Sequence, residues 1–211
     1  MDNGIYSKIK SFYPIIGTSV ADMIIDAKNV DGNTIFSGGE ERYSYDNGYL
    51  KCATKPSSED VYEVPFTLKS EMSFFVGAKY KAFSNTFIAS FFNDNGDVIK
   101  FEEWGGSYTP LHVSFAGNDY AATASYSDNN RVYSFTYDGY NIRLKFNGRS
   151  VKNEPLSVES VNITKVINTI VNINGNVLGT FLCIADALTD TEENILHTAI
   201  DTFLTTIGKR D

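Results

Sequence analysis

Residues 132–151 alternate between apolar and polar side chains, and this alternation constrains the fold more than any other feature of the chain. Apolar or aromatic residues stand at every second position of Tyr133–Tyr137 and of Tyr140–Phe146, which is the period of a β-strand with one buried face. The dipeptides Asp138-Gly139 and Asn147-Gly148 follow the two runs. Both tolerate the positive φ angles that tight hairpin turns require. The segment therefore predicts three successive antiparallel strands.

The rest of the chain repeats this strand pattern. Asn93-Asp94-Asn95-Gly96 lies between two apolar runs, 86–92 and 98–101, and predicts a hairpin that joins two central strands. Residues 19–30 fit either a short helix or a strand. Aromatic residues make up 14% of the chain, which is typical of half-buried strands. Strands are predicted near residues 33–37, 43–46, 48–54, 61–68, 71–78, 85–93, 97–104, 110–116, 120–126, 131–137, 140–147, 159–173 and 178–184.

A helix is predicted near the end of the chain. Thr189 and Glu192 have the spacing of a capping box, in which each side chain accepts a hydrogen bond from a backbone N–H of the first turn. Acidic residues at 190, 192 and 193 suit the positive end of the helix dipole, and Gly208 is a stop signal. Apolar residues recur at spacings of three and four, at Ile195, Leu196, Ala199, Ile200, Phe203, Leu204 and Ile207. The sequence predicts one amphipathic helix over about 189–207 that packs on the strands.

Two of these motifs resemble those of a known family. Thr136-Tyr137-Asp138-Gly139, a strand and then Asn147-Gly148 are similar to the central signature of laminin-G-like domains, which have the concanavalin A-like fold. Leu188-Thr189-Asp190-Thr191-Glu192 resembles the element that closes many of these domains. The resemblance implies an all-β, antiparallel jelly-roll β-sandwich with one C-terminal amphipathic helix, as a single domain over residues 1–211. Members of this family mostly serve as binding or display domains, and many are not catalytic.

The start of the chain resembles laminin-G-like proteins of tailed bacteriophages. Tyr13-Pro14-Ile15-Ile16-Gly17, followed by Asp26–Asn29, is similar to their opening motif, although Thr18 stands where that motif has a second glycine. This resemblance implies a structural protein of a phage particle, in the tail, a fibre or the capsid decoration. Its partners would be other virion proteins, including further copies of itself, and glycans of the host surface.

Charge and hydropathy argue against several other classes. The formal net charge is -8, whereas nucleic acids require a basic face. Lys and Arg are scattered, and no run approaches the roughly 18 apolar residues that span a bilayer. The first residues lack the basic and then apolar pattern of a secretory signal, so we expect synthesis in a host cytoplasm and assembly into a virion. Cys52 and Cys183 have no metal-type spacing and are expected to be buried and reduced.

The best candidate for a binding site is the segment Phe101–Pro110. It contains Trp104, the only tryptophan, and Tyr108, whose rings could stack on a sugar. Glu102 and Glu103 could accept hydrogen bonds from sugar hydroxyls, and two glycines let the backbone approach a ligand. In the alternative interpretation, Trp104 ends a strand and plugs the edge of the core, while the glycines form the turn.

No pattern in the chain predicts catalysis. Glycosidases with this fold carry two carboxylates about 5 Å apart on one face of a strand. Glu102 and Glu103 are neighbours in sequence and would point to opposite faces. His112 and His197 have no motif around them, and His197 is expected to be solvated because its helix neighbours are polar.

A calcium site also lacks a complete motif. Asn93-x-Asn95-x-Asp97 begins like a calcium loop, but Val98 and Trp104 replace the required glycine and glutamate. Turn chemistry accounts for this segment. Oxygen atoms of other residues could still meet around a calcium ion at the rim, namely those of Asp128, Asn129, Asn130 and Asp138.

These observations predict a non-enzymatic display protein without a cofactor. In one version the domain binds host glycans weakly, and several copies on a particle convert weak sites into avidity. In the other it is a scaffolding virion protein with no glycan site. A glycoside hydrolase or lyase is a third class, which the missing carboxylate pattern disfavours.

Overall fold

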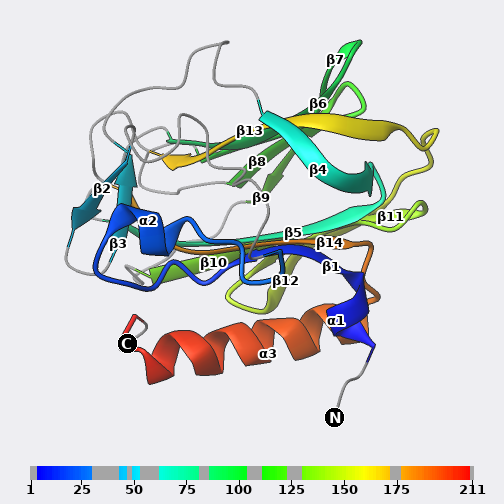
Figure 1. Ribbon diagram of the computed structural model, residues 1–211. Coiled ribbons are helices and arrows are strands. Elements are labelled where there is room, and N and C mark those ends of the chain that lie inside the picture. Colours follow the sequence, from blue (N-terminus) through cyan, green and yellow to red (C-terminus); the bar gives the residue numbers. More distant parts are fainter. Residues whose placement is uncertain are drawn as a thin grey trace.

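A computed structural model describes residues 4–29, 43–46, 49–52, 62–80, 86–103, 111–122, 130–171 and 177–209 (Figure 1). These residues form two antiparallel β-sheets packed face to face, with one long helix against the outer face of the larger sheet. The predicted fold class, an antiparallel jelly-roll sandwich with a C-terminal helix, is confirmed.

The larger sheet contains eight strands, with bounds β1 (Ile9–Tyr13), β2 (Tyr43–Asp46), β3 (Tyr49–Cys52), β5 (Met72–Tyr80), β10 (Asn130–Tyr137), β11 (Asn141–Phe146), β12 (Arg149–Pro155) and β14 (Val177–Asp186). Their order is β12-β11-β10-β5-β14-β3-β2, and β1 pairs with β14. Strands β10, β11 and β12 are the three predicted from the alternating segment. Gly139, Asn147 and Gly148 between them have positive φ, as the predicted turns require.

The smaller sheet contains six strands, with bounds β4 (Tyr62–Lys69), β6 (Thr86–Asn93), β7 (Gly96–Glu103), β8 (Leu111–Phe115), β9 (Asn118–Ala122) and β13 (Asn162–Val171). Their order is β4-β13-β6-β7-β8-β9. The predicted β6–β7 hairpin is confirmed. Strand β9 begins two residues before the predicted position 120, because Ala116 and Gly117 form the preceding turn at φ 51° and 75°.

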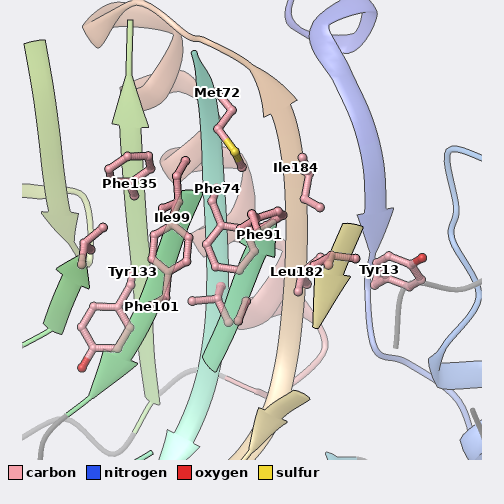
Figure 2. Close-up of a cluster of buried hydrophobic side chains, with 14 of the residues drawn as sticks. Tyr13, Met72, Phe74, Phe91, Ile99, Phe101, Tyr133, Phe135, Leu182 and Ile184 are labelled. Atoms are coloured by element: carbon pink, nitrogen blue, oxygen red, sulfur yellow. The ribbon is translucent and has the colours of Figure 1, made fainter. Parts of the chain in front are cut away.

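Phenylalanine side chains from both sheets build the core between them. Phe74 of β5 lies against Phe91 of β6 and Phe101 of β7, with ring centroids 5.4 and 4.6 Å apart. Phe101 also contacts Phe135 of β10 at 5.2 Å in an edge-to-face arrangement, which aromatic rings favour. Figure 2 shows these rings packed together, and each is at most 1% exposed. Truncating one of them to alanine would cost about 3–5 kcal/mol.

Helix α3 (Asp190–Thr206) covers the outer face of the larger sheet (Figure 1). Its predicted capping box is confirmed. The N–H of Glu192 donates to Oγ1 of Thr189 at 3.3 Å, and the N–H of Thr189 donates to Oε2 of Glu192 at 2.8 Å. Helix and sheet share a second apolar cluster, which includes Ile5, Phe75, Phe181, Leu188, Leu196, Ile200 and Leu204.

The N-terminal part of the chain contains elements that the sequence did not predict. Helix α1 (Ile5–Lys8) precedes β1, which pairs with β14. Residues 19–30 contain helix α2 (Val20–Met23), which resolves the ambiguity in favour of a helix. The strand predicted at 33–37 lies outside the described residues. Within the described ranges, none of the helices combines the length and the apolar character that crossing a membrane requires.

The opening motif holds β1 in place. Asp26 is buried, and its Oδ2 accepts a hydrogen bond from the hydroxyl of Ser11 at 2.6 Å. Its Oδ1 accepts from the backbone N–H groups of Phe12 and Lys28, both at 2.9 Å. A buried carboxylate needs such donors. Asp26 therefore links the segment after α2 to β1 through hydrogen bonds. Because this contact is polar and buried, the pattern of apolar residues in the sequence did not predict the strand.

Candidate functional site

The two sheets differ in what covers their outer faces. Helix α3 lies across the larger sheet, whereas Figure 1 shows no helix of the described residues over the smaller sheet. Strands β7, β8 and β9 follow one another at one edge of this smaller sheet. No helix of the described residues covers their outer surface, so this surface is a candidate for a ligand site.

Buried and polar residues alternate along β7, β8 and β9. Their buried core side chains are Ile99, Phe101, Val113, Phe115 and Tyr120. Successive side chains on a strand point to opposite faces, so the residues between them lie on the outer surface. We call this set the polar face, and its members are Lys100, Glu102, His112, Ser114 and Asp119.

Strand register brings the members of the polar face together. Glu102 stands opposite His112, and Lys100 stands opposite Ser114, which in turn stands opposite Asp119. The Nζ atom of Lys100 lies 2.9 Å from Oε1 of Glu102. The hydroxyl of Ser114 donates to Oδ1 of Asp119 at 2.5 Å. The result is a row of two carboxylates, an ammonium, a hydroxyl and an imidazole across three strands.

Burial and nearby charges shift the pKa of His112 in opposite directions. Burial of the imidazole lowers its pKa, while the carboxylates of Asp119 and Glu102 partly offset that effect. The net shift is downward, so the ring is neutral at pH 7. A neutral imidazole carries one donor and one acceptor. Because Nδ1 of His112 is buried, at most the other ring nitrogen can contact a ligand hydroxyl beside the carboxylates and the ammonium.

The structure describes only part of the predicted site. Glu102 lies on the polar face, and Glu103 is the last residue of β7. The side chain of Glu103, and all of Trp104 and Tyr108, lie outside the described residues. Glu103 pairs with Leu111, next to the Glu102–His112 pair.

Sequence reasoning missed most of the polar face. Lys100, Ser114 and Asp119 were not singled out, and His112 was noted without a partner. The signal was present in Leu111-His112-Val113-Ser114-Phe115, where polar residues alternate with apolar ones. The strand order needed to place Glu102 opposite His112 could not be read from that pattern.

His197 is not solvated, and the prediction that it would be is wrong. The residue is 6% exposed, its Nε2 lies 2.8 Å from the hydroxyl oxygen of Ser134, and its ring lies 5.1 Å from that of Phe75. Its neighbours in sequence are polar, but the helical repeat places it on the same side as Glu193 and Ile200. That side faces the sheet.

The two cysteines were expected to be buried. Cys183 is fully buried and carries a free thiol, and burial raises its pKa far above the usual range. It packs in the apolar cluster beneath α3. The side chain of Cys52 lies outside the described residues.

The suspected calcium residues that the structure describes have other roles. The N–H of Asn95 donates to Oδ1 of Asn93 at 2.8 Å, which is the turn chemistry expected there. Asp138 accepts hydrogen bonds from two backbone N–H groups of its own turn and from Arg143. Asp128 and Asn129 lie outside the described residues, as does the side chain of Asn130. Within the described part, no three His, Cys, Asp or Glu residues gather to hold a metal ion.

These features define an antiparallel jelly-roll β-sandwich that presents a polar row on the outer face of its smaller sheet. No protein-family model matches the chain, and a search of curated proteins found no match. Solved structures do share its fold.

One similar structure is the receptor binding domain of botulinum neurotoxin type G, with 12% identity, a TM-score of 0.63, and coverage of 91% of this chain and 51% of that one. Another is the binding domain of Paraclostridial Mosquitocidal Protein 1, with 11% identity, a TM-score of 0.62, and coverage of 92% and 53%. The chain thus spans about half the length of these two binding domains.

A third similar structure matches over almost its whole length. It is domain 4 of an extracellular arabinanase of family GH43 from Geobacillus stearothermophilus, solved in complex with arabinotriose. Identity is 15%, the TM-score is 0.59, and the match covers 90% of this chain and 98% of that one. At such identities the likeness establishes the fold, and function has to be argued from the site.

Proposed function

We propose that this protein is a non-catalytic β-sandwich that binds glycans on the polar face. The observation that carries the proposal is the row of Glu102, His112, Lys100, Ser114 and Asp119 on the sheet face opposite to the one that α3 covers. Carboxylate oxygens accept hydrogen bonds from sugar hydroxyls, and the ammonium of Lys100 donates to sugar oxygens. The hydroxyl of Ser114 donates its proton to Asp119, so its oxygen serves as a further acceptor. Directed polar groups of this kind set the orientation of a ligand.

Charge and fold also support a glycan ligand. A net charge of -8 disfavours nucleic acid. A domain of the same fold was solved with arabinotriose, and two others are described as binding domains. Trp104 follows β7 directly in sequence, and its ring would add an aromatic contact for the sugar.

We further propose that the domain is displayed on a tailed phage particle. The support is the resemblance of Tyr13–Gly17 and Asp26–Asn29 to the opening motif of phage laminin-G-like proteins. Several copies on one particle would strengthen weak binding to the host surface through avidity. Mass spectrometry of purified particles would test this role, and absence of the chain from every particle fraction would refute it.

A scaffolding role without a glycan site is the second candidate. It is favoured by Tyr6 and Tyr140, two aromatic side chains that are 60% and 77% exposed. Exposed tyrosines are enriched at contacts between proteins. In that case the chain would form complexes with virion proteins and would bind no glycan.

The test of glycan binding uses two matched pairs of residues. Lys100 and Glu102 form an ion pair on β7, and Lys152 and Glu154 form a similar pair on β12, with a Nζ–Oε1 distance of 3.2 Å. Glu102→Gln should remove binding on a glycan array, whereas Glu154→Gln should leave it unchanged. Equal binding by both variants, or no binding by the unmodified chain, would refute the proposed function.

A further inference from the structure

A groove opens at the other edge of the smaller sheet, between β4 and β13. The register of these strands jumps, because Ile163 pairs with Leu68 but Lys165 pairs with Glu63. Residues 64–67 therefore stand opposite a single residue of β13. An insertion of this kind bends a strand away from its partner. A groove of about 730 Å³ lies along the irregularity.

The groove combines an aromatic residue with polar groups of both charges. Its lining includes Glu63, Phe66, Asp94, Asn162 and Lys165. The Nζ atom of Lys165 lies 3.2 Å from Oδ1 of Asp94, and both side chains remain substantially exposed. Two carboxylates against one ammonium leave the groove with a net negative charge, which disfavours an anionic ligand.

We propose that this groove is a second saccharide site and that it takes a neutral pyranose. Phe66 supplies an apolar surface for the C–H face of a sugar ring, and the carboxylates of Glu63 and Asp94 accept hydrogen bonds from its hydroxyls. The amide of Asn162 and the ammonium of Lys165 donate to its oxygen atoms. A volume of 730 Å³ falls in the range of small-molecule sites.

The groove is spatially distinct from the polar face. In the order β4-β13-β6-β7-β8-β9, strand β6 separates the groove strands β4 and β13 from the polar-face strands β7, β8 and β9. The nearest of these strands, β13 and β7, are two strand spacings apart, which is about 10 Å. The two sites share no residue. The groove proposal rests on the proposed function only in assuming that the ligand is a saccharide. Substitutions in one site can remove its binding without touching the other site.

Two-dimensional NMR of the full chain would test the groove with defined probes. The neutral pyranose probes are cellotriose and maltotriose, and 3′-sialyllactose is the anionic contrast, each added to about 10 mM so that a site with Kd near 1 mM is detected. We expect at least one neutral probe to shift the amide signals of residues 63–67 and 162–165. The sialylated probe should shift them less.

Variants then separate the two sites. Glu63→Gln and Asp94→Asn should each weaken binding at the groove by about tenfold and leave the shifts at residues 112–114 intact. Glu102→Gln should reduce the shifts at residues 112–114 and leave those at the groove intact. Glu154→Gln should leave both sets of shifts unchanged. Because all four residues are at the surface, the fold should survive, and unchanged spectra without sugar would verify this.

The outcomes distinguish failure of the groove from failure of the glycan proposal. Shifts confined to residues 100–119 would overturn the groove and retain the polar face. Shifts at the groove that persist in both Glu63→Gln and Asp94→Asn would also overturn the proposed contacts. No shift with any probe would overturn both proposals.

Discussion

Arg143 of β11 and Glu193 of α3 form a buried ion pair, with Nε of the arginine 2.7 Å from Oε2 of the glutamate. Glu193 is fully buried and Arg143 is 6% exposed. The remaining oxygen of Glu193 accepts a hydrogen bond from Thr136 at 2.7 Å, and Arg143 also donates to Asp138 and to the carbonyl of Leu188. The pair and these further hydrogen bonds thus link helix α3 to strands β10 and β11 and to the turn between them.

Removing one partner of this pair should destabilise the protein strongly. Glu193→Ala removes one of the two carboxylates that face the buried guanidinium of Arg143, and we expect a loss of about 3–5 kcal/mol in the free energy of unfolding. Urea unfolding followed by circular dichroism would measure it. Glu154→Ala, at an exposed ion pair, is the control and should change stability by about 0–1 kcal/mol. A similar small loss in both variants would contradict the structural role of Glu193.

The cap of α3 gives a smaller and more local prediction. Thr189→Ala removes the acceptor for the N–H of Glu192, and we expect a loss of about 1 kcal/mol. Thr198→Ala is a matched control, because Thr198 is exposed on the same helix and its hydroxyl donates to the carbonyl of Asn194. Thermal unfolding of the two variants would show whether only the first has a lower Tm.

Lys209 makes stability depend on pH in the alkaline range. Burial lowers its pKa to about 8, and its Nζ donates to the carbonyl of Ile15 at 2.5 Å. In the unfolded chain the pKa is about 10.4, so between these values the unfolded state binds more protons than the folded state. The free energy of unfolding should therefore gain a contribution as the pH rises from about 8 to about 10.4, and should lose it as the pH falls.

The contribution of Lys209 is isolated by comparison with Lys209→Met, which cannot titrate. Urea unfolding of both proteins at several pH values would give the difference in free energy of unfolding. We expect the difference, unmodified minus variant, to increase between pH 8 and pH 10. A flat or decreasing difference would contradict the lowered pKa.

Local sequence signals predicted the strands and the helix well. The turn dipeptides around Gly139 and Gly148 and the capping box at Thr189 involve residues a few positions apart, so their chemistry is visible in sequence. Glu193 shows the limit of such signals. In sequence it is one acid in a run that suits the helix dipole, and only the position of α3 on the sheet makes it the buried partner of Arg143.

The candidate sites depend on register, which a single sequence does not encode locally. Glu102 was predicted from its neighbours Trp104 and Tyr108, but its partner His112 becomes apparent only when β7 and β8 are paired. The groove beside Glu63 arises from a jump in the pairing of β4 with β13, strands about 100 residues apart in the chain. Long-range pairing of this kind leaves no periodic trace in either strand.

Trp104 provides the sharpest test of the glycan proposal, because two roles predict opposite outcomes for one substitution. If the ring contacts a sugar beside Glu102, Trp104→Ala should abolish binding on a glycan array or to host cells and leave the Tm nearly unchanged. If the ring instead plugs the core, the variant should lose about 3–5 kcal/mol of stability through the cavity it creates. The glycan proposal predicts the first outcome.

Tyr140→Ala is the control, since this ring is 77% exposed on the β10–β11 turn of the other sheet. Its loss should affect neither glycan binding nor Tm. A fall in Tm for Trp104→Ala with glycan binding retained by the folded fraction would instead make the ring part of the core and rule it out as a sugar contact.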